Sequence, residues 1–262
     1  MDDRKTLSAL ADDLAKGRVT AEKLAEAALA RASAPDGEGA RVFTRIAPDE
    51  VLSAARESDS LRRAGRVRSP LEGLPISVKD LFDIRGQQTR AGSRVLAEAP
   101  PAARDAPVVR RLKAAGAVIV GRTNMTEFAY SGLGINPHYG TPLNPFDRAA
   151  GRIPGGSSSG AAVSVTDGMA AGAIGTDTGG SCRIPAALCG LVGYKPTARR
   201  VPLDGSVPLS WTLDSIGPLA RSVACCALLD QVISGGAGAP AAATPAVKGL
   251  RLALPKTLVQ EG

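Results

Sequence analysis

The sequence of 262 residues predicts an α/β fold, because strand-like and helix-like segments alternate along its first half. The segment 74–80 begins apolar and ends polar, as in a buried strand that leaves the core. The segment 105–115 has apolar residues at helical spacing and is followed by Gly116. The run 117–120 is continuously apolar, which is typical of a strand covered on both faces in a parallel sheet. This strand–helix–strand order indicates an α/β protein.

The remaining elements follow from periodicity, caps and breakers. Two helices are expected near the N-terminus, each preceded by a threonine that can cap it, Thr6 and Thr20. The first should end before Gly17, and the second should run from Ala21 to about Arg31. The other expected elements are a strand at 42–46, a helix at 48–64, a short helix at 123–128, an irregular segment at 131–152, a turn and strand at 190–196, a loop at 201–218 and a helix at 220–233.

Composition is that of a globular protein with a sizeable core, since 44% of the residues are hydrophobic and 22% are charged. Aromatic residues make up 3%, so the core should consist of aliphatic side chains, and single-strand nucleic-acid binders that interleave aromatic with basic residues do not fit. The net charge of +7 comes largely from scattered arginines. This distribution predicts a solvated basic surface more than a nucleic-acid-binding face.

The four cysteines have no C-x-x-C spacing, and the single histidine is at no metal-ligand spacing, so no zinc site is expected. Free, buried thiols in a reducing compartment are expected instead, which predicts a cytoplasmic location. The N-terminus leads into an amphipathic segment and shows no secretory signal. No run of 18 apolar residues predicts a membrane span.

Two glycine–serine loops, 154–160 and 175–185, flank a segment of small residues at 161–174. Glycine before serine lets the chain turn where a Cβ would clash, and it leaves backbone N–H groups free to point at a ligand. A serine with such donors beside it is the arrangement of a nucleophile next to an oxyanion hole. Either loop alone is equally compatible with an ordinary surface loop.

Two other interpretations of these loops fit less well. Residues 156–160 match the G-x-S-x-G pattern of hydrolase nucleophile elbows, but that arrangement needs a later histidine, and His138 precedes the loop. A Ser-His-Asp triad with His138 in another chain order stays open. A phosphate-binding P-loop has the spacing of Gly155 and Gly160 but has Ala161 where a lysine is required.

Without a usable histidine, a serine nucleophile needs another base, and Lys79 is the best candidate. It follows the apolar residues 74–78, so it should be drawn into the interior, where burial lowers the pKa of a lysine. The alternative is a lysine at the end of a strand that is paired with Asp80 or Asp83.

Four blocks of the sequence resemble the amidase signature family. They are GLPISVKD at 73–80, PGGSS at 154–158, GTDTGGSCRIP at 175–185 and GYKPT at 193–197. The resemblance extends from near the N-terminus to about Pro218, and several specific blocks occur in the right order. It implies a mixed, largely buried central sheet flanked by helices.

The resemblance implies a Ser–cis-Ser–Lys triad. Ser181 would be the nucleophile, Ser157 the bridging serine on a cis peptide bond after Gly156, and Lys79 the base. The other implied site residues are Thr178, Gly179, Gly180 and Ser181 as oxyanion-hole N–H donors, Ser158, Asp177 and Arg183 as supports of the network, and Met125 and Ala129 as substrate contacts.

The implied reaction is hydrolysis of a carboxylic amide to an acid and ammonia or an amine through an acyl-Ser181 intermediate, without a metal or organic cofactor. The expected partner is a small-molecule amide, with no nucleic acid and no membrane. The N-terminal helices are similar to a family dimer element, so a homodimer is one expectation and a monomer the other. Two alternatives stay open: the glutaminase component of a glutamyl-tRNA(Gln)-type amidotransferase, which releases ammonia from glutamine for partner chains, and an inactive fragment or interaction module.

The predicted domain organisation is one signature domain followed by a short remainder. The domain covers 1–234, with N-terminal helices at about 4–33 and a signature core at about 70–218. The remainder consists of a Gly/Ala/Pro-rich linker at 235–249 and the start of a C-terminal part at 250–262, in which a strand is expected at 250–254. Family members are longer, so a truncation is expected in the part that completes the sheet and lines the acyl pocket. Ser159 stands where the family often has glycine, a change expected to narrow the loop.

Overall fold

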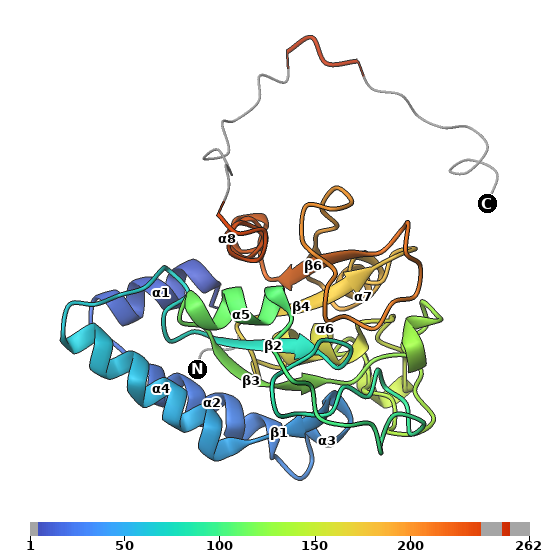
Figure 1. Cartoon of the computed structure of the whole chain (residues 1–262), viewed down its shortest axis with the longest axis horizontal. Coiled ribbons are helices and arrows are strands. Elements are labelled where there is room, and N and C mark those ends of the chain that lie inside the picture. The colour runs from blue at the N-terminus through green and yellow to red at the C-terminus, as the bar shows by residue number, and fades with distance from the viewer. Residues whose placement is uncertain (1–4, 237–247, 252–262) are drawn as a thin grey trace.

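The computed structural model describes residues 5–236 and 248–251 and is organised around a six-stranded mixed sheet (Figure 1). The strand order is β1-β3-β2-β4-β6-β5. Strands β3, β2 and β4 run parallel at the centre, and the outer pairs β1/β3, β4/β6 and β6/β5 are antiparallel. The strands are β1 (Phe43–Ile46), β2 (Pro75–Lys79), β3 (Val118–Thr123), β4 (Gly172–Asp177), β5 (Val192–Gly193) and β6 (Ser215–Ala220).

Helices cover both faces of this sheet. One hydrophobic cluster joins helices α1, α5 and α8 to the sheet, and a second joins α6 and α7 to it. Helices α2 and α4 lie side by side at the β1/β3 side of the molecule (Figure 1). The helices are α1 (Leu7–Ala15), α2 (Ala21–Ala32), α3 (Gly39–Val42), α4 (Pro48–Arg63), α5 (Pro107–Ala114), α6 (Ser159–Thr166), α7 (Arg183–Leu188) and α8 (Val223–Ile233), with 3₁₀ turns η1 (Glu127–Ala129) and η2 (Arg148–Ala150).

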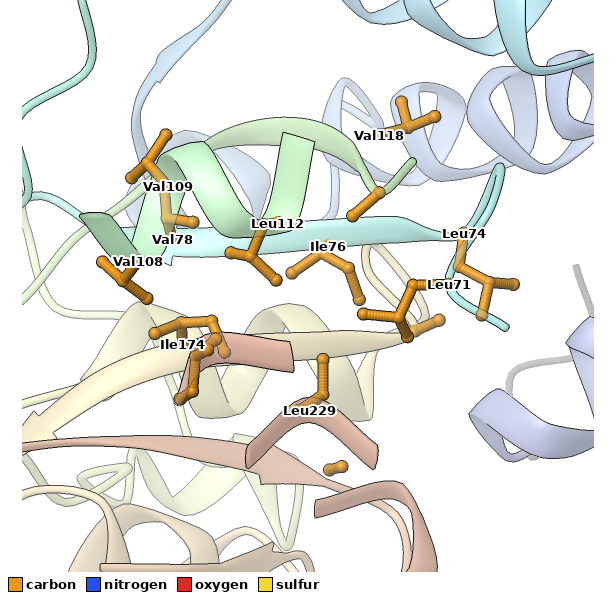
Figure 2. Packing of buried hydrophobic residues seen from close by; sticks show 14 of the residues in the cluster. Leu71, Leu74, Ile76, Val78, Val108, Val109, Leu112, Val118, Ile174 and Leu229 are labelled. Atoms are coloured by element: carbon orange, nitrogen blue, oxygen red, sulfur yellow. The ribbon is translucent and has the colours of Figure 1, made fainter. Parts of the chain in front are cut away.

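The central strand β2 divides its side chains between the two faces, because successive residues of a strand point in opposite directions. Ile76 packs in the cluster of α5 and α8, where Figure 2 shows it beside Leu112. Ser77 faces α6, since its hydroxyl lies 2.9 Å from the hydroxyl of Ser164. The same alternation turns Lys79 towards the α6 side, where the glycine–serine loop 154–160 enters that helix.

Many of the predicted elements are confirmed, and so are the fold class and the mixed, helix-flanked sheet. Thr6 and Thr20 cap α1 and α2 by accepting hydrogen bonds from the N–H groups of Ala9 and Lys23. The predicted strands at 42–46, 74–80 and 117–120 correspond to β1, β2 and β3, and the predicted helices at 48–64, 105–115 and 220–233 to α4, α5 and α8. The four cysteines are free and buried, as expected.

The prediction of a loop over 201–218 is wrong at its end, where β6 lies inside the sheet between β4 and β5. Gly217 and Pro218 make this strand hard to predict, because proline has no backbone N–H to donate to the neighbouring strand and is rare in central strands. Pro218 still contributes its carbonyl, which accepts the N–H of Tyr194 at 3.0 Å. The short helix expected at 123–128 begins later, since Thr123 ends β3 and the single turn η1 covers 127–129.

Three helices, the single-turn α3 and the helices α6 and α7, are not predicted from the sequence. Seven consecutive residues of α6, from Ser159 to Val165, are buried, so this helix has no polar face and no amphipathic pattern. Part of the predicted linker at 235–249, and all of the predicted strand at 250–254 after Arg251, lie outside the described residues.

Candidate active site

Lys79 is the central ionisable group of the site and is fully buried at the end of β2. Its Nζ donates hydrogen bonds to Ser157 Oγ at 2.7 Å and to Thr176 Oγ1 at 2.8 Å. Burial lowers the pKa of Lys79 from 10.5 to about 7, and the nearby Cys182, Asp177 and Asp214 oppose this shift only in part. The amine is therefore poised to exchange a proton with Ser157 near neutral pH.

The alternative partnership of Lys79 with Asp80 or Asp83 is wrong. The Asp80 carboxylate accepts a hydrogen bond from Arg122 Nε at 2.7 Å, and Asp83 accepts one from the hydroxyl of Thr89 at 2.7 Å. Among the described residues, Lys79 forms no ion pair with a carboxylate. The lysine is thus held by two hydroxyl groups, which do not stabilise its charged form as a carboxylate would.

Ser157 lies in a backbone loop that packs tightly against the rest of the site. The peptide bond between Gly156 and Ser157 is cis, as the resemblance implies. The N–H of Gly156 donates to the carbonyl of Gly132 at 2.8 Å, and the carbonyl of Ser157 accepts the N–H of Thr126 at 3.1 Å. A Cβ at Gly156 would lie 2.6 Å from the backbone nitrogen of Gly134, so no larger residue fits there.

Helix α6 brings this loop to the sheet because Gly160 and Gly175 permit close approach. A Cβ at Gly160 would lie 2.4 Å from the carbonyl oxygen of Val42, and one at Gly175 would lie 2.6 Å from Ser158 Oγ. Ser159, the departure from the family pattern, is buried at the start of α6. Its hydroxyl is directed to the carbonyl of Asn124 at 3.5 Å.

Ser181 lies across from this loop, and its carbonyl accepts the N–H of Ser158 at 3.3 Å. Within the described residues no hydrogen bond links the hydroxyls of Ser181 and Ser157, so the structure joins Lys79 to Ser157 but not these two serines to each other. Ser181 is 7% exposed and follows two glycines, of which Gly179 is exposed and Gly180 is buried.

Asp177 anchors the chain just after Ser181. Its carboxylate accepts the backbone N–H groups of Cys182 and Arg183 and both arms of the Arg183 guanidinium, at 2.8 to 3.3 Å. Burial alone would raise the pKa of Asp177, but the hydrogen bonds from Arg183 and the Cys182 N–H outweigh it and hold the pKa below its usual range. The carboxylate therefore stays charged and keeps residues 182 and 183 in place.

The loop 178–181, which we call the oxyanion loop, presents backbone donors beside Ser181. Among the described residues, no hydrogen bond uses the N–H groups of Gly179, Gly180 or Ser181. Gly180 has a φ of +137°, which non-glycine residues rarely adopt. Unpaired donors next to a serine hydroxyl are suited to bind an oxygen that gains negative charge.

Sequence reasoning missed Thr176, which shares the Lys79 amine with Ser157. Thr176 lies on β4, the parallel neighbour of β2, and the pairing of Val78 with Ile174 brings the two strand ends together. The sequence did place Thr176 in the GTDTGGS block that resembles the family. The neighbouring residues, however, do not indicate which side chain of that block contacts Lys79.

Met125 and Ala129 lie on the segment that contacts Ser157 through Thr126, and both are buried. Their role as substrate contacts stays a prediction. The ring of His138 contacts a carboxylate, since its Nε2 lies 2.7 Å from Glu127 Oε1. The hydroxyl of Ser93 donates to the same Glu127 oxygen and not to the histidine. The Ser-His-Asp alternative therefore has no support in the contacts of His138.

The described residues contain neither a metal-binding cluster nor a membrane-spanning helix. No group of three or more His, Cys, Asp or Glu side chains in this part of the chain is arranged to hold a metal ion. None of the helices in the described ranges is long and apolar enough to cross a membrane.

The fold and this site agree with the family comparison, in which the model described as Amidase matches residues 23–257. The chain belongs to the amidase signature family. It is 44% identical over 269 residues to the A subunit of the glutamyl-tRNA(Gln) amidotransferase of Chloroflexus aggregans, with 98% of this chain and 54% of the relative covered.

Two further relatives are named for other functions. The chain is 44% identical over 224 residues to AtzE, a 1-carboxybiuret hydrolase subunit of Pseudomonas sp. strain ADP, covering 86% of this chain and 48% of the relative. It superposes on the native peptide amidase of Stenotrophomonas maltophilia with a TM-score of 0.80 at 39% identity, covering 91% of this chain and 51% of the other. The chain thus spans about half the length of the relatives it matches.

Proposed function

We propose that this chain carries the catalytic centre of an amide hydrolase that works through an acyl-Ser181 intermediate. The observation that supports this most directly is the buried amine of Lys79, 2.7 Å from Ser157 Oγ and without a carboxylate partner among the described residues. With its pKa lowered to about 7, a large share of the amine is uncharged at neutral pH and can accept a proton.

In the proposed reaction, Ser181 Oγ attacks the amide carbonyl and its proton passes to Ser157, whose own proton moves to Lys79. The developing oxyanion accepts hydrogen bonds from the N–H groups of the oxyanion loop, each worth about 3 kcal/mol in related chemistry. Ser157 then protonates the departing amine and regains a proton from Lys79. A water molecule next attacks the acyl-enzyme, its proton passes through Ser157 to Lys79, and the same route returns a proton to Ser181 Oγ as the acid leaves. Substrate binding brings the two serine hydroxyls together, since such hydrogen bonds are often long in unliganded enzymes.

A second candidate function is the glutaminase part of an amidotransferase. It is favoured by the 44% identity to a protein named as the A subunit of a glutamyl-tRNA(Gln) amidotransferase, whereas AtzE and the peptide amidase favour a hydrolase. Both curated relatives are named as subunits, so a partner chain is a reasonable proposal beside a homodimer through α1 and α2. The substrate in either case is a small or peptide amide.

Purified chain incubated separately with glutamine, simple aliphatic amides, a peptide amide and an aryl amide tests the proposal. We expect ammonia or amine release that is lost in Ser181→Ala. Turnover of glutamine alone would favour the amidotransferase function. The hydrolase proposal would be contradicted by a folded chain that hydrolyses none of these amides, or by a Ser181→Ala variant as active as the wild type. An inactive fragment or interaction module would then be the remaining alternative.

A further inference from the structure

Asp214, named so far only for its charge near Lys79, contacts the oxyanion loop directly. It lies immediately before β6, and its Oδ1 accepts the hydroxyl of Thr178 at 2.5 Å. Because Asp177 pairs with Ser215 in the β4/β6 ladder, Thr178 and Asp214 occupy the next cross-strand position beyond its end. This side-chain bond therefore continues the strand pairing by one step, into the loop that carries the backbone donors.

The carboxylate of Asp214 is itself firmly held. Its Oδ2 accepts the N–H groups of Leu209 at 2.9 Å and Ser210 at 3.1 Å, and its own N–H donates to the carbonyl of Ser210 at 3.0 Å. Asp214 is 8% exposed, so these bonds are largely shielded from water. The backbone of the 209–214 turn therefore holds the Asp214 carboxylate in one position.

The oxyanion loop has few other constraints at this end. Gly179 is exposed, and a Cβ there would meet nothing within 4 Å, so packing does not hold it. Asp177 fixes the chain after Ser181 through residues 182 and 183. The hydrogen bond from Thr178 to Asp214 fixes the chain in the same way before Gly179 and Gly180.

We propose that Asp214 is a positioning residue, which acts through the Thr178 hydroxyl to hold the N–H groups of Gly179 and Gly180 where an oxyanion forms beside Ser181. Its consequence for the reaction rests on the proposed hydrolase function, whereas its consequence for the loop does not. Two carboxylates, Asp177 and Asp214, thereby clamp the oxyanion loop from both sides.

The first test is independent of turnover. Backbone ¹⁵N relaxation of Gly179 and Gly180 is compared in the wild-type chain and in Thr178→Val, which keeps the shape of the side chain and removes the hydroxyl. We expect order parameters near 0.85 in the wild type and below about 0.6 in Thr178→Val. Thr178→Ser should restore the rigid values, and Thr212→Val, the same change on the exposed face of the 209–214 turn, should leave them unaltered.

The second test measures kcat and KM on the amide found to be the substrate. A displaced donor weakens binding of the transition state more than of the ground state, so Thr178→Val should lower kcat about tenfold to a hundredfold with KM little changed. Thr178→Ser should recover most of kcat. Rigid glycines in Thr178→Val, or flexible ones already in the wild type, would overturn the proposal. An inactive wild-type chain would instead contradict the hydrolase function and leave the relaxation result to decide the role of Asp214.

Discussion

Lys79 is buried where a charged amine is unfavourable, and this burial makes the free energy of unfolding depend on pH. The folded chain holds this amine at a pKa of about 7, while an unfolded lysine titrates near 10.5. Between these values the unfolded chain binds one more proton at this residue than the folded chain does. The penalty of burying the amine is therefore complete below about pH 7 and is lost as the pH rises towards 10.5.

Replacing Lys79 by methionine removes this titration while retaining most of the side-chain volume. We expect the unfolding free energy of the wild type to rise with pH, relative to Lys79→Met, by about 1.4 kcal/mol per pH unit in the middle of this window, and less steeply towards either end. Urea unfolding at pH 7, 8, 9 and 10 measures the difference. Parallel curves for the two proteins would mean that Lys79 is charged in the fold.

Arg122 and Asp80 form a buried charged pair near the end of β2, and both side chains are almost fully covered. Burial raises the pKa of Asp80, and the Arg122 charge opposes this. Arg122→Met should destabilise the chain by about 3–5 kcal/mol, because it leaves a buried carboxylate unpaired. The double variant Asp80→Asn with Arg122→Met should recover part of that loss in thermal or urea unfolding. An equal or larger loss in the double variant would contradict this account.

Helix α6 is a packing element whose small residues let Ser157 and Ser158 reach the sheet. Its contact with the carbonyl of Val42 and the backbone of Asn124 leaves no room for a Cβ at Gly160. A longer side chain would push the helix outwards and move the loop 154–160 away from Lys79. The element therefore transmits a packing change directly to the site.

Gly160→Ala tests that link. We expect a loss of about 1–3 kcal/mol in unfolding free energy, because the new methyl group overlaps backbone atoms that cannot rotate away. Gly179→Ala is the matched control for stability, since a Cβ there has open space, and it should change stability by less than about 0.5 kcal/mol. Equal stability of the two variants would show that α6 can shift without cost.

At the scale of the whole molecule, the layer of α5 and α8 covers the face of the sheet opposite the site. Leu229 of α8 is buried in that layer with Ile174 and Ile76 (Figure 2). This layer supports β2 and β4, the two strands that carry Lys79 and Thr176. Its integrity is thus a condition for the site, although none of its side chains reaches it.

Leu229→Ala should destabilise the fold by about 2–5 kcal/mol through the cavity it leaves. Val223→Ala, on the same helix but 73% exposed, should cost less than about 0.5 kcal/mol. Chemical unfolding of the two variants checks the contrast. A Leu229→Ala variant as stable as Val223→Ala would mean that α8 is not part of the cooperative core.

Local signals explain why much of the fold was predictable. Thr6 and Thr20 cap their helices with neighbouring residues, and the apolar spacing that follows is a property of a short segment. Helix α6 and strand β6 escaped prediction because neither pattern is local. The small residues of α6 matter because of the backbone atoms that they approach, and Pro218 in β6 lacks the N–H of an ordinary strand residue although its carbonyl still accepts the N–H of Tyr194.

The sequence by itself determined the fold class, the amphipathic helices such as the threonine-capped α1 and α2, and the kinds of groups available: a lysine after an apolar strand and serines among glycines. Only the tertiary structure decided that the Lys79 amine meets both Ser157 and Thr176, which are 78 and 97 residues away along the chain. It likewise decided that Asp214 meets Thr178, 36 residues distant. The physical reason is that these contacts arise from the register of β2, β4 and β6, which depends on how whole strands pack rather than on the residues beside each group.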